Sequence, residues 1–145
     1  MQRIVVGLDG SDSSRRALVW AIDLAEQLGE AEVRVLAVCE DVATAYEKGF
    51  CTHTQAEEWL AERRDESERL LGEILATEGR QSPATALRLE TVPGRPAQVL
   101  VDASEDADLL CVGPRGLGRL RGLLGSVSQA CLANAHCPVV VVRDH

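Results

Sequence analysis

Short apolar runs alternate along this chain with longer stretches in which apolar residues recur every three or four positions. The apolar runs at residues 4–8, 33–39, 109–112 and 139–142 have the length of single strands. Residues 87–92 instead alternate apolar and polar side chains with a period of two, which is typical of a half-exposed strand. The pattern therefore predicts five strands.

The stretches between these strands predict four helices. The first helix follows a turn and cap at residues 9–12, and the second spans residues 55–78. The third opens at residues 94–96, and the fourth spans residues 126–135. Residues 41–53 are expected to form a loop. Gly29 and Gly79 end the first two helices, and Pro96 suits a first helical turn. The apolar positions expected to face the core are Ala17, Leu18, Ala21, Ile22, Ala25, Leu28, Leu60, Leu70, Leu71, Ile74, Leu75, Val99, Leu100, Ala103, Val127, Ala130, Cys131 and Ala135.

This alternation predicts a doubly wound α/β fold, a Rossmann-like architecture in which a five-stranded parallel sheet carries helices on both faces. The strand at residues 87–92 suits an edge because one of its faces is polar, whereas the apolar strands at 4–8 and 109–112 suit the centre. The order 3-2-1-4-5 satisfies both conditions. Nothing suggests a repeat or a second domain, so residues 1–145 are predicted to form one domain.

In this strand order the topological switch point lies between strands 1 and 4, and ligands of such sheets bind outside the carboxyl ends of the strands there. The two carboxyl ends are Asp9 and Gly113. A glycine- and arginine-rich segment starts at the second of them, with Gly113, Gly116, Gly118, Gly122 and Gly125 beside Arg115, Arg119 and Arg121. Two separate features of the sequence therefore indicate one cleft.

The glycine-rich segment is interpreted as a phosphate cradle. Glycines let backbone N–H groups approach a ligand, Ser126 stands where a helix N-terminus adds further donors, and arginine side chains supply positive charge. No Asp or Glu occurs from Leu109 to Arg143, although the formal net charge of the chain is −8. The alternative is that this segment is half-buried strand and helix, where acidic residues are scarce in any case.

Composition narrows the class of protein. A chain of 145 residues, 46% of them hydrophobic, can bury a sizeable core, and its net acidity argues against nucleic acid or an anionic membrane as partner. The first strand begins without a signal peptide and the five cysteines form no CxxC pair, so a cytoplasmic protein is expected. Cys51 and His53 are close enough in sequence to suggest a metal site, but no second ligand pair accompanies them, and a solvated loop is preferred.

Motifs of other nucleotide-binding and hydrolytic proteins fail on specific residues. A P-loop needs a lysine after its last glycine, and the only lysine is Lys48. The dinucleotide fingerprint fails at Arg121, where its third glycine would stand, and Gly125 directly before Ser126 rules out a G-x-S-x-G elbow. His136 has no recognisable triad partners. No catalytic base is evident, so the sequence favours a binding protein in which any nucleotide hydrolysis is slow.

The chain resembles the universal stress protein family over essentially its whole length. The residues that carry the resemblance are IVVGLDGS at 4–11, VGPRG at 112–116, GSVS at 125–128 and CPVVVV at 137–142. The central two correspond, apart from one spacing described below, to the G-x2-G-x9-G-(S/T) pattern of the family's nucleotide-binding branch. The resemblance implies the five-stranded α/β fold of that family and ATP, with Mg²⁺, as the ligand.

The resemblance also implies roles for individual residues. Asp9, in one turn with Gly10 and Ser11, would reach the ribose or the adenine, or else only cap that turn. Val38 would offer backbone groups to the adenine edge, or else be a core valine. The remaining implied roles are close backbone approach at Gly113 and Gly116, steering of phosphates by Arg115, and donation to the phosphate chain from Gly125, Ser126, Val127 and Ser128. Ser126 is also a candidate helix N-cap.

The spacing departs from the family pattern at one point. Eight residues, 117–124, separate Gly116 from Gly125, where the pattern has nine. Removing one residue from a helical turn rotates all later residues of the helix by roughly 100°. Glycines inside the segment can absorb this rotation locally. Otherwise the donors at Gly125 and Ser126 would miss the phosphates.

The valines from Val139 to Val142 form an edge strand that invites pairing with the same strand of a second copy around a two-fold axis. The resemblance implies such homodimers too. Three functions stay open: an ATP-binding stress-response regulator that acts through dimer or protein-partner contacts, an interaction protein of the family's branch that binds no nucleotide, and a weak nucleotide hydrolase or transferase. The glycines and Arg115 favour the first over the second, and the lack of a base disfavours the third.

Overall fold

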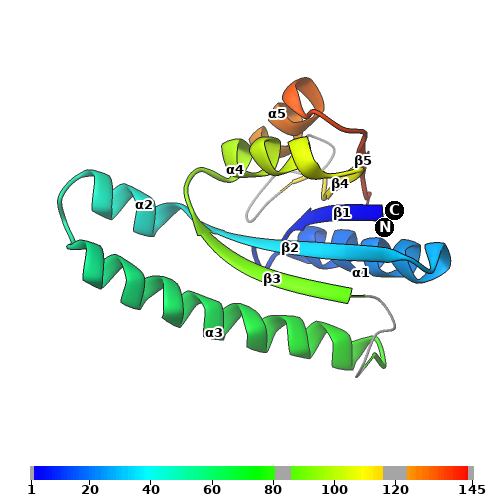
Figure 1. Cartoon of the computed structure of the whole chain (residues 1–145), viewed down its shortest axis with the longest axis horizontal. Coiled ribbons are helices and arrows are strands. Elements are labelled where there is room, and N and C mark those ends of the chain that lie inside the picture. The colour runs from blue at the N-terminus through cyan, green and yellow to red at the C-terminus, as the bar shows by residue number, and fades with distance from the viewer. Residues whose placement is uncertain (1, 81–85, 116–123, 144–145) are drawn as a thin grey trace.

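The computed structural model describes residues 2–80, 86–115 and 124–143 (Figure 1). In chain order its elements are β1 (Gln2–Gly7), α1 (Asp12–Leu28), β2 (Ala31–Cys39), α2 (Glu40–Glu47), α3 (His53–Thr77), β3 (Ala86–Pro93), α4 (Pro96–Ala103), the short 3-10 helix η1 (Ser104–Asp106), β4 (Leu109–Val112), α5 (Ser126–Asn134) and β5 (Val139–Val141). Strand and helix alternate except between β2 and β3, where α2 and α3 follow one another.

The strands form one parallel sheet of order β3-β2-β1-β4-β5. Val5 of the central strand β1 pairs with Arg34 of β2 on one side and with Leu110 of β4 on the other. The helices α1 and α3 lie on one face of the sheet, and α4 and α5 lie on the other (Figure 1). The predicted doubly wound α/β fold and its strand order are confirmed.

The larger core lies between the sheet and the pair α1 and α3. Buried side chains from the strands and from α1 build it: Ile4, Val6, Val33, Val35, Ala17, Leu18, Ala21, Ile22 and Ala25. Ile74 of α3 is buried in the same cluster, with Leu70, Leu71 and Leu75 half-buried beside it. The prediction for Leu28 is wrong. Its side chain is 49% exposed because it is the last residue of α1 and lies outside this cluster.

The second core lies between the sheet and the pair α4 and α5, and it covers only part of that face of the sheet. Its buried members are Val5, Leu36, Leu100, Leu110, Val112 and Cys131. Towards the amino ends of β2 and β3 the same face carries charged residues instead, namely Glu32, Arg34, Arg88 and Glu90. This half of the face therefore lacks the apolar residues that a packed helix would cover.

The loop predicted at residues 41–53 is wrong for its first part, where α2 forms. Val42 is buried beside Cys39 and Ala56 in a small third cluster, so tertiary packing stabilises this short helix. Glu40 and Asp41 occupy its first turn, where negative charge interacts favourably with the helix dipole.

The long helix α3 begins two residues earlier than predicted because Thr52 caps it. Thr52 Oγ1 accepts from the Gln55 N–H at 3.1 Å, and Gln55 Oε1 accepts from the Thr52 N–H at 2.9 Å, which forms a capping box. Arg63 forms an ion pair with Asp41 of α2, and this hydrogen bond lowers the pKa of the Asp41 carboxyl. No helix within the described ranges is both long and apolar enough to cross a membrane.

The two edge strands differ in whether a side chain occupies their outer backbone groups. Arg64 of α3 donates from Nη1 to the carbonyl oxygen of Leu89 in β3 at 2.9 Å, so a helix side chain occupies a backbone acceptor of that edge strand. β5 forms the other edge and ends at Val141, one residue before the predicted end. The N–H of Val142 still donates to the Val112 carbonyl at 2.8 Å. Among the described residues, no strand lies beyond β5.

Candidate functional site

A cavity of about 500 Å³ opens at the carboxyl ends of β1, β2 and β4, where the N-terminal ends of α4 and α5 meet the sheet. It is called the carboxyl-end cleft below. Its lining comprises Gly7, Leu8, Asp9, Ser14, Leu36, Val38, Glu40, Arg95, Pro96, Ala97, Leu100, Val112, Gly113, Arg115, Gly125, Ser126, Val127 and Ser128. The cavity lies at the predicted switch point, between the ends of strands 1 and 4.

The turn after β1 is held by its own side chains. Asp9 Oδ1 accepts from the N–H of Ser11 at 2.9 Å and from its hydroxyl at 2.5 Å. Ser11 is the N-cap of α1 and accepts from the Ser14 N–H at 3.1 Å. Gly10 has a φ of 86°, a left-handed conformation that glycine adopts without strain. Asp9 therefore caps the turn and lines the cleft, whereas Gly10 and Ser11 hold the turn without lining the cleft.

The end of β4 passes close to α1. A Cβ atom built on Gly113 would lie 2.1 Å from Ser13 Oγ, so only glycine fits there. The next residue, Pro114, offers its carbonyl oxygen to the Gly125 N–H at 2.7 Å and to the Ser128 hydroxyl at 2.9 Å. These two bonds bring the start of α5 back against the end of β4 and fix one wall of the cleft.

The N-terminus of α5 faces the cleft. Gly125 is its N-cap, with extended φ of −71° and ψ of 166°, and Ser126 is its first helical residue, so the N-cap predicted at Ser126 is wrong. The reason is that Gly125, whose N–H is tied to Pro114, occupies the non-helical position, and the helical bonds begin with Gln129 donating to the Gly125 carbonyl at 3.0 Å. The N–H groups of Ser126, Val127 and Ser128 precede that first bond, as the orphan donors of a helix do.

The wall on the β2 side is apolar. Val38 is half-buried, lines the cleft and packs against the second core. Leu36 continues this wall and is almost fully buried. A flat apolar ligand group would find its complementary surface here, while polar groups belong at the α5 end.

The sequence predicted the glycine-rich side of this site and missed the part contributed by α4. Asp9, Val38, Gly113, Arg115, Gly125, Ser126, Val127 and Ser128 all line the cleft, whereas Gly116 lies outside the described residues. The lining residues that it missed are Gly7, Leu8, Ser14, Leu36, Glu40, Arg95, Pro96, Ala97, Leu100 and Val112. The signal for the α4 part was present, because a helix opening directly after strand 3 starts at the carboxyl edge of a parallel sheet.

The cleft mixes charges of both signs. Arg95, the N-cap of α4, and Arg115 line it together with the acidic residues Asp9 and Glu40. Among the described residues no group of three His, Cys, Asp or Glu side chains is placed to hold a metal ion. Cys39, directly before Glu40, is buried, and this burial raises the pKa of its thiol. An uncharged thiol is a poor nucleophile. The start of α5 and the arginines beside it could hold an anion.

Known proteins of one family are similar to this chain in sequence. The profile of the universal stress protein family matches residues 1–143. Universal stress protein Rv2623 of Mycobacterium tuberculosis is 37% identical over 146 residues, which cover 97% of this chain and 47% of that protein. A universal stress protein of Thermus aquaticus is 37% identical over 143 residues, which cover 97% of each chain. The chain thus spans about half the length of the mycobacterial relative and nearly all of the Thermus one.

A solved structure with a related sequence shares the fold. The crystal structure of a universal stress protein in complex with cAMP superposes with a TM-score of 0.60 and is 28% identical, covering 98% of this chain and 96% of its own. The family match over residues 1–143, the two relatives and this structural likeness agree. The chain belongs to the universal stress protein family.

Proposed function

We propose that this protein binds ATP, as its Mg²⁺ complex, in the carboxyl-end cleft and acts as a stress-response regulator. The observation that carries the proposal is the first turn of α5. Its three leading N–H groups, on Ser126, Val127 and Ser128, border the cleft beside Arg115. A helix N-terminus and a guanidinium group together suit a phosphate chain.

The rest of the cleft suits the nucleoside. Val38 and Leu36 offer an apolar wall to the base. Asp9 follows the carboxyl end of β1, where a ribose hydroxyl can reach its carboxylate. The cavity of about 500 Å³ is within the usual range for cofactor sites. The related protein solved in complex with cAMP supports a nucleotide as the class of ligand.

Regulation through binding is preferred over catalysis. Of the histidines that the structure describes, neither His53 nor His136 lines the cleft. The Asp9 carboxylate is engaged by Ser11 and so is poorly placed to take a proton from water. Any ATP hydrolysis is therefore expected to be slow. The five cysteines form no disulfide, which fits a cytoplasmic protein.

We further propose that nucleotide binding is transmitted through a homodimer formed by β5. Val139 and Val141 are half-buried on the second-core side, and Val140 faces the first core. The alternation along a parallel strand turns the backbone groups of Val139 and Val141 to the free edge of the described sheet. A second copy related by a two-fold axis would cover this edge, leaving the other surfaces for a protein partner.

The test is calorimetric titration of nucleotide-stripped protein with Mg-ATP, for wild type, Ser126→Glu and Ser126→Ala. A carboxylate at the first position of α5 interacts favourably with the helix dipole, so Ser126→Glu keeps the fold while it repels phosphates. We expect Ser126→Glu to weaken ATP binding by at least about tenfold, because like charges in contact cost several kcal/mol. Ser126→Ala keeps the backbone donors and should bind ATP nearly as well as wild type.

Two outcomes would overturn the proposal. Equal affinity of Ser126→Glu and wild type would show that phosphates do not bind at α5. No heat of binding with millimolar Mg-ATP would assign the chain to the family's branch that binds no nucleotide. A parallel titration with cAMP tests whether the protein prefers a mononucleotide. A titration with ATP in the presence of EDTA tests whether ATP binds without Mg²⁺.

A further inference from the structure

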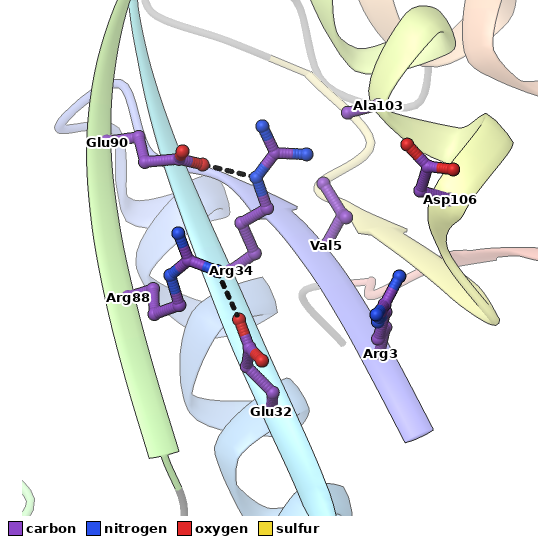
Figure 2. Close-up of a pocket in the computed structure, with 8 residues that line it drawn as sticks. All are labelled: Arg3, Val5, Glu32, Arg34, Arg88, Glu90, Ala103 and Asp106. Atoms are coloured by element: carbon purple, nitrogen blue, oxygen red, sulfur yellow. Dashed lines mark hydrogen bonds and ion pairs between the residues drawn. The ribbon is translucent and has the colours of Figure 1, made fainter. Parts of the chain in front are cut away.

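A second cavity, of about 310 Å³, lies on the half of the sheet face that α4 and α5 leave uncovered (Figure 2). It is called the amino-end pocket. Its lining comprises Arg3 and Val5 of β1, Glu32 and Arg34 of β2, Arg88 and Glu90 of β3, Ala103 of α4 and Asp106 of η1. The universal stress protein resemblance implied no role for any of these eight residues.

The charges on the strand side of this pocket pair diagonally. Arg34 and Arg88 are direct partners in the register of β2 and β3, an arrangement in which like charges repel. Each reaches a carboxylate on the other strand: Arg34 Nε forms an ion pair with Glu90, and Arg88 Nη1 lies 3.3 Å from Glu32. The two pairs are drawn as dashed lines in Figure 2. The two ion pairs orient both guanidinium groups on the sheet.

The pairing of Arg34 leaves most of its donors available. Only Nε contacts Glu90, and Figure 2 shows both terminal Nη groups turned away from Glu90 towards the pocket. A guanidinium group has five N–H donors, so four are left for a ligand. The side chain is 34% exposed, which leaves it accessible yet partly shielded from water. A planar fork of this kind is complementary to a carboxylate.

The opposite wall carries one charge of each sign, on Asp106 of η1 and Arg3 of β1. Asp106 of η1 lines the same pocket, and among the described residues its carboxylate has no hydrogen-bond or ion-pair partner. Figure 2 shows Val5 and Ala103 between the Arg34 and Asp106 side chains. The pocket thus offers the Nη donors of Arg34 at one end and the Asp106 carboxylate, with Arg3 nearby, at the other, with apolar side chains between them. Its volume is at the lower end of the usual range for small-molecule sites.

We propose that the amino-end pocket binds a small zwitterion, an amino acid whose carboxylate pairs with Arg34 and whose ammonium group pairs with Asp106. The methylene groups between these two charges lie against Val5 and Ala103. This site is separate from the carboxyl-end cleft, because the buried side chains of Leu36 and Leu100 lie on the same face between the two. Its ligand is therefore independent of the nucleotide proposed above.

The experiment is an NMR titration of ¹⁵N-labelled protein with a series of unbranched amino acids of increasing length: glycine, β-alanine, 4-aminobutyrate and 6-aminohexanoate. Butyrate and butylamine, which carry one charge each, are the matched control ligands. We expect saturable shifts of the amides of Val5, Arg34 and Ala103, with one chain length preferred and both single-charge controls weaker by at least about tenfold.

Two variants test which residue binds each charged group of the amino acid. Arg34→Gln and Asp106→Asn should each weaken binding of the preferred amino acid by at least about tenfold, since each removes a charge-assisted hydrogen bond. Glu105→Gln is the control, because Glu105 neighbours Asp106 but does not line the pocket. A thermal melt of each variant confirms its folding.

Three results would overturn the proposal. Butyrate binding as tightly as 4-aminobutyrate, with Asp106→Asn unaffected, would indicate a simple anion site. Shifts confined to the amides of Gly113 and Ser126 would move the ligand to the carboxyl-end cleft. Shifts that fail to saturate at tens of millimolar for every member of the series would leave the charged face merely solvated.

Discussion

A methyl group on Gly113 would lie 2.1 Å from Ser13 Oγ and 2.9 Å from the carbonyl carbon and Cβ of Ser13. The end of β4 and the first turn of α1 therefore touch through the space that a side chain would fill. This contact holds two walls of the carboxyl-end cleft together. The glycine is explained by packing between β4 and α1, whether or not a ligand is bound.

Gly113→Ala is accordingly predicted to lower the free energy of unfolding by about 1–3 kcal/mol, the usual cost of overpacking. Ser13→Ala should restore only part of this loss, because the Ser13 backbone carbon stays in contact. Gly72→Ala is the control, since a methyl group there meets no atom within 4 Å on α3 and should stabilise the helix by about 0.5–1 kcal/mol. Urea unfolding of the three variants and the double variant measures this. Equal stabilities of Gly113→Ala and wild type would contradict the packing argument.

Val141→Pro is predicted to abolish the proposed homodimer without unfolding the subunit. The carbonyl of Pro138 and the N–H of Val142 bond to β4, so the alternation along a parallel strand turns the Val141 N–H towards the free edge. Proline removes only that outward donor, and edge strands tolerate it. Val141→Ala, which keeps the donor, should stay dimeric.

Sedimentation at micromolar concentration distinguishes these cases. The expected result is a dimeric mass for wild type and Val141→Ala and a monomeric mass for Val141→Pro. A monomeric wild type, or a dimeric Val141→Pro, would show that β5 is not the interface.

Two buried thiols should make the protein less stable at high pH. Burial raises the pKa of Cys111 to about 12 and that of Cys131 to about 11, from the ordinary value of 9.0. Below pH 9 both the folded and the unfolded chain hold these protons. Above it the unfolded chain releases them while the folded chain does not, so each thiol lowers the free energy of unfolding by up to about 1.4 kcal/mol per pH unit until its folded pKa is reached.

The measurement is urea unfolding under reducing conditions at pH 8, 9 and 10. The double variant Cys111→Ala/Cys131→Ala should be less stable at pH 8 and should lose less stability between pH 9 and 10 than wild type. Cys51→Ala, a change in the connection between α2 and α3, is the control and should keep the wild-type slope. Equal slopes for all three proteins would refute this assignment.

The strand order could be predicted because the composition of three strands reports their places in the sheet. The alternating strand β3 is an edge, and the apolar strands β1 and β4 are central. α2 could not be predicted, because its single buried residue, Val42, gives no periodicity and its stability depends on packing against Ala56 of α3. The periodicity of apolar residues identifies helices and strands that bury a whole face, and it misses a short helix with a single buried residue.

The candidate site was predictable where it lies on one continuous segment and missed where it depends on a crossover. Asp9 and the residues around Gly125 line the cleft as expected, but Arg95 enters it from the connection between β3 and α4. The amino-end pocket was missed for the same reason, since it combines β1, β2, β3 and η1. The effect of the spacing of eight residues between Gly116 and Gly125 and the single-domain organisation of residues 1–145 stay predictions.

The Arg64 side chain that occupies the Leu89 carbonyl bears on how copies of this protein can assemble. β3 and β5 run in the same direction, so joining β5 of one copy to β3 of the next would extend the sheet indefinitely into a filament. A guanidinium group bound to the edge of β3 obstructs that head-to-tail joining, while β5 carries no such block among the described residues. A sheet that can grow at one edge only stops at two copies, so in the proposed homodimer this asymmetry of the edges would limit assembly to a closed pair.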